Sequence, residues 1–236
     1  MRDFLLFLRE YWRFKKLDNG RERFSLRWRD RYACLGDKAA VTGFDRHYVY
    51  HTAWAARILA ETSPERHLDI SSSLYFCTLM SAFIPVEFFD YRRVDLELDG
   101  LQCDAADLCS LPFADSSVAS LSCMHVVEHV GLGRYGDRLD PDGDLKAIAE
   151  MTRVVAKGGN LLFVVPVGGA PVILFNAHRI YTYDQIIGYF DSLQLVEFTL
   201  IPDDAKDGGL IRNATKKQSD AQRYGCGCFW FRKVQL

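Results

Sequence analysis

Three aspartates lie along the chain at intervals that suit a nucleotide ligand. Asp90 comes 21 residues after Asp69, and Asp107 follows one short apolar run later. An acid about 20 residues beyond the first strand of a nucleotide-binding unit commonly accepts hydrogen bonds from ribose hydroxyls. The alternative for each acid is an ordinary surface turn. The residues that we expect to bind a cofactor are Asp69, Ser71, Ser72, Asp90, Tyr91, Asp107, Leu108 and His125.

A second group of reactive residues begins with His125-Val126-Val127-Glu128-His129, which has the HxxEH spacing of the inverted zinc-protease motif. On a helix, both histidines would share one face and bind zinc. The segment instead follows a strand-like run, so we expect it to line a cofactor pocket, and we predict no metal site. The candidate catalytic residues are His129, His178 and Tyr135, with either histidine as the general base.

The loop Gly131–Asp137 contains three glycines, an arginine, a tyrosine and an aspartate. Glycine permits close backbone approach, and a guanidinium group can bind a carboxylate or phosphate. A flexible surface loop is the alternative interpretation. We expect the acids that follow this loop to cap the next helix, because they lack the full spacing of a calcium loop. The candidate substrate-binding residues are Arg134, Asp137, Asn176 and Arg179.

The composition is that of a globular protein. Of the 236 residues, 49% are hydrophobic and 25% are charged, which excludes a wholly disordered chain. The net charge of −2 argues against nucleic-acid binding by the whole surface. The seven cysteines include no CxxC pair, and this predicts free thiols in a reducing cytoplasm.

Positive charge is concentrated near the N-terminus. Residues 1–31 hold ten Lys or Arg and five acids, so they carry +5 and the remainder carries −7. Apolar residues recur at helical spacing from Phe4 to Phe14, with basic residues between them. Such a helix could lie on an anionic membrane surface, mediate a homodimer, act as a lid, or pack on its own domain with a solvated basic face.

Strand and helix patterns alternate along the rest of the chain, which predicts a parallel-centred α/β sheet. We expect a helical extension over residues 1–62 that packs on an α/β domain over 63–236. Lys157-Gly158-Gly159 is interpreted as a helix C-cap, and Gly225-Cys226-Gly227-Cys228 as a tight bend. The expected helices span 47–61, 73–83, 144–155 and 183–190. The expected strands span 67–70, 86–91, 101–105, 118–124, 161–165, 195–200 and 229–234.

The order of strand, Asp107-Leu108, Leu111-Pro112-Phe113 and a further strand resembles class I S-adenosylmethionine-dependent methyltransferases. The stretches HVVEHVGLGRYGD, DPDGDLKAIAE, GGNLLFVVPVG and FNAHRIY resemble an uncharacterised bacterial family of methyltransferase-like proteins, encoded near polysaccharide-biosynthesis genes. The resemblance implies a Rossmann-like, mostly parallel sheet with helices on both faces, S-adenosylmethionine as cofactor, and Asp107 beside the adenine amino group. Serines stand where the general methyltransferase pattern has a glycine-rich turn.

Two functions follow from this resemblance. The first is methyl transfer from S-adenosylmethionine to an oxygen of a sugar or polysaccharide precursor, with Arg134 or Arg179 holding an anionic group of the acceptor. The second is a non-catalytic module with the same fold, which would act as a partner in glycan assembly and dock through its basic N-terminal helix. The acidic series favours the enzyme, and the missing glycines favour the module.

Overall fold

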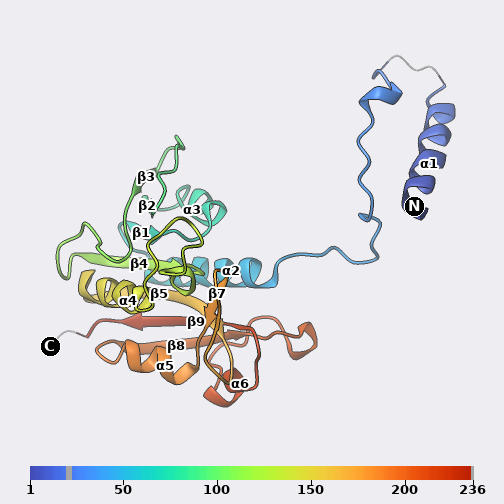
Figure 1. Ribbon diagram of the computed structural model, residues 1–236. Coiled ribbons are helices and arrows are strands. Elements are labelled where there is room, and N and C mark those ends of the chain that lie inside the picture. The colour runs from blue at the N-terminus through green and yellow to red at the C-terminus, as the bar shows by residue number, and fades with distance from the viewer. Residues whose placement is uncertain (20–22, 235–236) are drawn as a thin grey trace. The chain divides into compact units, whose positions relative to one another are not determined.

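The computed structural model describes residues 1–19 and 23–234 and consists of two compact units (Figure 1). The first unit is Met1–Phe44 and the second is Asp45–Leu236. Helix α2 (Arg46–Thr62) therefore belongs to the second unit, whereas we had placed it in the extension. Its apolar face, including Trp54 and Ile58, is buried in the core of the second unit, which explains this difference.

The first unit is built around helix α1 (Arg2–Asp18), which is longer than the predicted Phe4–Phe14 segment. Trp28 packs edge-on against Tyr11, with ring centroids 4.9 Å apart, and stacks on Trp12 at 6.4 Å. Tyr11 is the buried residue of this helix, so most of its apolar side chains face outward. Among the described residues, no helix combines the length and the apolar character that crossing a membrane requires.

The second unit contains a sheet of seven strands in the order β3-β2-β1-β4-β5-β9-β8. The first five pair in parallel, and β9 runs antiparallel between β5 and β8. The strand order reverses between β1 and β4, and ligands of such sheets bind at the carboxyl ends beside that point. The strands are β1 (His67–Ile70), β2 (Val86–Asp90), β3 (Leu101–Ala105), β4 (Val118–Met124), β5 (Val155–Val167), β8 (Gln194–Ile201) and β9 (Gly225–Arg232).

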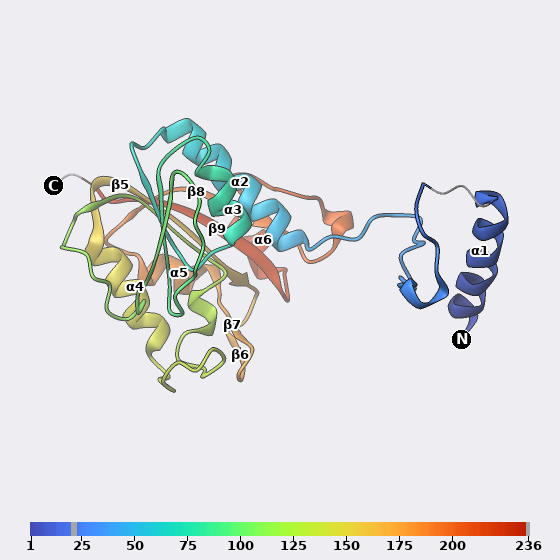
Figure 2. The same cartoon turned by 90° about the horizontal axis from the view of Figure 1, so that it is seen from above.

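Helices cover both faces of this sheet (Figure 2). On one face, α4 (Gly143–Val154) and α5 (Tyr183–Tyr189) pack into a core that includes Phe163 and Phe229. On the other face, α2 and α3 (Leu74–Met80) pack against Phe88 and Trp230. The α/β fold predicted from the sequence, mostly parallel with helices on both faces, is confirmed.

Several local predictions need correction. Helix α3 ends at Met80, and β9 already begins at Gly225, so the expected bend at Gly225–Cys228 is extended strand. The expected helix C-cap at Gly158 lies inside β5, where the glycine has φ +77° and the pairing with β4 shifts register. A glycine in a strand interior often marks such a bulge. The hairpin β6–β7 (Val172–Leu174, His178–Ile180) and the short helix α6 (Lys216–Asp220) were not predicted.

Candidate functional site

A cavity of about 480 Å³ lies at the carboxyl ends of β1, β2, β3 and β4. This size is within the usual range of small-molecule sites, roughly 300–1,000 Å³. Seven of the eight predicted cofactor residues line it, because each lies at or just beyond the carboxyl end of one of these parallel strands. Those seven are Ser71, Ser72, Asp90, Tyr91, Asp107, Leu108 and His125.

Asp90 and Asp107, with the loops that carry them, form what we call the acidic wall of the cavity. One carboxylate oxygen of Asp90 accepts a hydrogen bond from the Arg92 backbone N–H at 2.9 Å. Asp107 does the same for the Cys109 N–H at 2.8 Å. Each carboxylate therefore fixes its own loop, and both residues line the cavity.

Asp69 is fully buried and lies beneath the cavity lining, where it fixes the first loop. Its Oδ1 accepts from the Ser72 N–H at 2.9 Å, and its Oδ2 accepts from the Ser122 hydroxyl. Ser122 in turn contacts His67 Nε2 at 2.8 Å. Burial raises the pKa of Asp69 to about 6 and lowers that of His67 to about 3. The structure thus gives Asp69 a positioning role in place of the expected cofactor contact.

Two residues at this strand edge adopt the left-handed backbone conformation that glycine prefers. Ser71 has φ +55° after β1, and His125 has φ +58° after β4. The Met124 N–H donates to the Ser72 hydroxyl at 2.9 Å, which ties the two strand ends together. The serine turn therefore takes up the backbone geometry that glycine usually supplies here, and strain of this kind clusters at functional sites.

Five of the six histidines gather around Glu128, and we call this group the histidine wall: His47, His51, His125, His129 and His178. Glu128 is 1% exposed, and its Oε1 accepts a hydrogen bond from His125 Nδ1 at 2.8 Å. The segment Val127–His129 is a single 3₁₀ turn, so the HxxEH residues do not share a helix face. The segment follows β4, as the sequence predicts.

His129 is held in one tautomer. Its Nδ1 lies 2.6 Å from the Ala177 carbonyl oxygen, so Nδ1 carries the proton and donates it. The ring therefore leaves Nε2 unprotonated as a base, 3.8 Å from Glu128 Oε1. Burial lowers the pKa of His129 below its usual range, so the imidazole is neutral at neutral pH.

The Gly131–Asp137 loop folds on its own aspartate. Asp137 Oδ2 accepts from the Gly131 N–H at 2.7 Å, and Oδ1 accepts from the Tyr135 N–H at 3.2 Å. Asp137 lines the cavity, but these hydrogen bonds show that its carboxylate holds the loop in its conformation. Tyr135 packs edge-on against His129 at 5.7 Å, and Arg134 donates to the Ala177 carbonyl at 3.1 Å.

Arg179 is 5% exposed, and its guanidinium is engaged by protein groups. It donates to the carbonyls of Val130 at 2.6 Å and Pro141 at 3.2 Å, and its Nε lies 3.5 Å from Asp144 Oδ2. The structure therefore gives Arg179 a structural role in place of the expected acceptor contact. Asn176, with φ +63°, does not line the cavity described above.

Sequence reasoning missed several lining residues. Tyr48 of α2 reaches the cavity and stacks on His125 at 5.5 Å, and burial raises its pKa to about 12. Arg92, Arg138 and Lys146 add positive charge to the lining. No motif marks these residues, because α2 is remote in sequence, Arg92 and Arg138 lie in loops of ordinary composition, and Lys146 lies in the first turn of α4.

A second hollow of about 910 Å³ lies beside the histidine wall. Its lining includes His47, His178 and Tyr224, so His178 faces this hollow and His129 faces the first cavity. Burial, then the nearby His125, lowers the pKa of His47 to about 4. Burial also lowers the pKa of His178. The two candidate bases thus lie 6.3 Å apart, measured between ring centroids, on different hollows.

Comparison with known protein families finds a match over residues 114–200, to the family described as "Caenorhabditis protein of unknown function, DUF268". The matched segment runs from the turn before β4 into β8 and includes the histidine-rich turn. No curated protein matches the chain.

Solved structures with the same fold are class I methyltransferase-like proteins. The Bradyrhizobium japonicum N-methyltransferase NodS, bound to S-adenosylhomocysteine, is 13% identical with a TM-score of 0.56, covering 86% of this chain and 94% of that one. The Burkholderia thailandensis 1,6-didemethyltoxoflavin-N1-methyltransferase, also bound to S-adenosylhomocysteine, is 13% identical with a TM-score of 0.56, covering 81% and 80%. The [4+2]-cyclase SpnF is 12% identical with a TM-score of 0.55, covering 78% and 82%. The second unit therefore has the fold of class I S-adenosylmethionine-dependent methyltransferases.

Proposed function

We propose that the second unit binds S-adenosylmethionine in the 480 Å³ cavity and transfers its methyl group to an oxygen of a sugar or polysaccharide precursor. The observation that carries the proposal is that Asp90 and Asp107 line one cavity at the point where the strand order reverses. Asp90 would accept hydrogen bonds from the ribose hydroxyls, and Asp107 would accept one from the adenine amino group.

His129 is the proposed general base. The cofactor, when bound, would supply an electrophilic methyl group on a sulfonium, whose sulfur would leave as a neutral thioether when the acceptor oxygen attacks the methyl carbon. His129 Nε2 would take the hydroxyl proton as the oxygen attacks, because Nδ1–H is already committed to the Ala177 carbonyl. Arg134 would hold an anionic group of the acceptor beside this base, since its guanidinium lies 3.3 Å from the His129 ring and is exposed.

Calorimetric titration with S-adenosylmethionine and with S-adenosylhomocysteine tests this proposal. Wild-type protein should bind both, and Asp90→Ala should weaken binding by roughly 10- to 100-fold, which corresponds to about 1.4–2.7 kcal/mol. Asp99→Ala is the matched control, because Asp99 is an exposed acid of the same segment outside the cavity lining. Wild-type protein that binds neither compound would refute the proposal and support a non-catalytic module.

We also propose that the first unit contacts an anionic membrane surface. Residues 1–31 carry +5, and the exposed apolar side chains of α1 include Trp12, Phe14 and Leu17. Basic side chains interleaved with aromatic and aliphatic ones are typical of helices that lie in a bilayer interface. The helix would then bring the α/β unit to lipid-linked precursors.

Vesicle co-sedimentation of the full chain tests the membrane contact. Binding to phosphatidylserine-containing vesicles should exceed binding to neutral ones, and the double variant Lys15→Glu, Lys16→Glu should lose roughly tenfold or more in affinity, at about 1 kcal/mol per basic residue. The charge-matched control is Lys206→Glu, Lys217→Glu in the second unit. Equal loss in both double variants would contradict a contact made by α1.

A further inference from the structure

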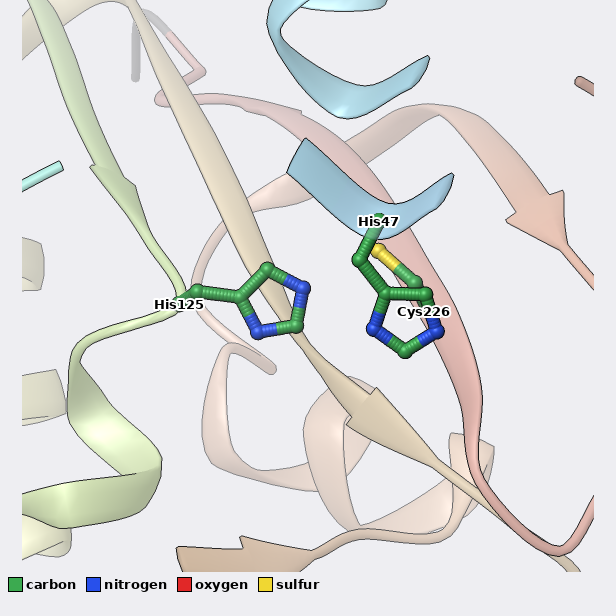
Figure 3. Close-up of side chains that lie close together, drawn as sticks. All are labelled: His47, His125 and Cys226. Carbon is green, nitrogen blue, oxygen red and sulfur yellow. The ribbon is translucent and has the colours of Figure 1, made fainter. Parts of the chain in front are cut away.

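His47, His125 and Cys226 bring three metal-binding side chains together from α2, from the end of β4 and from β9 (Figure 3). One potential ligand atom from each lies within 4.8 Å of the other two. Two imidazoles and one thiol are the nitrogen and sulfur donors that zinc and related borderline-soft ions prefer. No sequence motif singles out this set, because its members are remote in sequence.

The environment of His125 matches that of a metal ligand. Its Nδ1–H donates to buried Glu128, which is how carboxylates orient metal-binding histidines in proteins. Its Nε2 is buried and has no hydrogen-bond partner, and neither has Glu128 Oε2. Buried polar atoms are almost always paired, so these two mark a place where a further group belongs.

We propose that His47, His125 and Cys226 bind a divalent transition metal ion of the zinc class, with Glu128 as the positioning residue that orients His125. In tetrahedral zinc sites the bond lengths are about 2.0 Å to nitrogen and 2.3 Å to sulfur, which places ligand atoms roughly 3.4 Å apart. Because the ligand atoms lie within 4.8 Å of one another, they need to approach by at most about 1.4 Å to bind the ion, a movement that side-chain rotation can supply.

The three protein ligands leave a fourth coordination position open, which is the arrangement of catalytic rather than structural zinc sites. His125 lines the cavity at the strand ends, and His47 lines the second hollow. The ion therefore lies in the wall between the two, where its open position can take a water molecule or an oxygen of a bound ligand. His125 also lines the cavity proposed for the methyl donor, but none of the three ligands belongs to the acidic wall, so metal binding can be measured without a methyl donor.

Metal titration of tag-free, chelator-treated full-length protein tests the site without any methyl donor. Wild-type protein should bind one equivalent of zinc, and cobalt(II) should give the charge-transfer absorption of a thiolate ligand. Cys226→Ser should abolish that absorption and weaken zinc binding at least about 100-fold, whereas Glu128→Gln should weaken it roughly 10- to 100-fold. Cys123→Ser is the matched control, because Cys123 is an equally buried free thiol on β4 outside the cluster.

His47→Gln provides a second ligand variant on a half-buried helix position, so the test does not depend on the folding of the Cys226 variant. This variant should also lose at least about 100-fold in zinc affinity. Its cobalt–thiolate absorption should be weak or absent, in contrast to that of the wild-type protein. Wild-type protein that binds no zinc would overturn the proposal. So would wild-type affinity in both Cys226→Ser and His47→Gln. Methyl-donor binding is measured separately, so the two proposals fail independently.

Discussion

The acidic wall and the histidine wall face the same region of the sheet edge but are built in different ways. Asp90 and Asp107 each follow one parallel strand, and each is fixed by a backbone N–H two residues further on. The histidine wall draws on α2, β4, the following 3₁₀ turn and β7, and its members meet through ring stacking and one buried carboxylate. The acidic wall thus arises from the same strand-and-loop unit occurring twice, whereas the histidine wall arises from tertiary packing of elements that are distant in sequence.

This difference indicates how the two walls divide the work. Acids on loops at strand ends can accept hydrogen bonds from a ligand without being withdrawn from water. Burial lowers the pKa of His47 and of His129, because it disfavours the charged form of an imidazole. The acidic wall therefore suits recognition of a polar ligand, and the histidine wall suits proton transfer and metal binding.

The largest effect that would separate the two walls is expected for His129→Gln. Removing the base should lower kcat roughly 10²- to 10⁴-fold on any acceptor that supports turnover, because glutamine cannot take the proton. The dissociation constant for S-adenosylmethionine should stay within about threefold of wild type, since recognition belongs to the acidic wall. A variant with wild-type kcat, or with an equal loss in cofactor affinity, would contradict this division.

The pH profile sharpens the same prediction. The pKa of His129 is lowered by burial, so the neutral base accumulates at a pH below the usual histidine value of 6.5. Wild-type kcat should therefore rise with pH on the acid side of 6.5 and be flat above it. The His129→Gln variant should lose this rise of kcat with pH. If the rise is unchanged in the variant, the titrating group is not His129.

A smaller effect is expected at the start of β1, where the buried His67 contacts Ser120 and Ser122 of β4 at 2.8 Å each. Burial lowers its folded-state pKa to about 3 from 6.5, so between these values the unfolded chain binds the proton and the folded protein does not. Protonation of His67 in the unfolded chain therefore lowers the free energy of unfolding as pH decreases below 6.5, by about 2 kcal/mol at pH 5. Above pH 6.5 the contribution is absent.

Urea unfolding of wild type and His67→Gln at pH 7.5 and pH 5 measures this term, because glutamine can still bridge the two serines. The variant should lose less stability on acidification than wild type does. Asp69 opposes the trend in both proteins, since burial raises its pKa to about 6, so the difference between them isolates His67. Parallel pH dependences would show that His67 does not titrate in this way.

The strand ends were predictable because each parallel strand is a short apolar run followed by a turn, and this local sequence pattern recurs along the chain. The alternation of apolar runs and turns placed β1, β3 and β4 at their observed bounds, and the spacing of Asp90 and Asp107 followed from it. The histidine wall was only partly predictable, because the contact of His47 with His125 depends on how α2 packs across the sheet. Arg179 was misleading for a similar reason: we expected it to hold an anionic group of the acceptor, whereas packing buries the guanidinium against three partners.

Glycine was the least reliable local signal. Gly158 indicated the end of a helix but forms a bulge in β5, and Gly225 indicated a bend but begins β9. The serine turn showed the converse, because Ser71 adopts a positive φ without being glycine. Strand pairing and the tie from Ser72 to Met124 hold that turn in place, and neither is visible in a local pattern.

A crystal structure of the protein soaked with S-adenosylhomocysteine would show directly where a methyl donor binds. We expect the ligand in the cavity at the ends of β1 to β4, with its ribose hydroxyls on Asp90 and its adenine beside Asp107. Density for the ligand elsewhere, or an empty cavity at a saturating concentration, would contradict it.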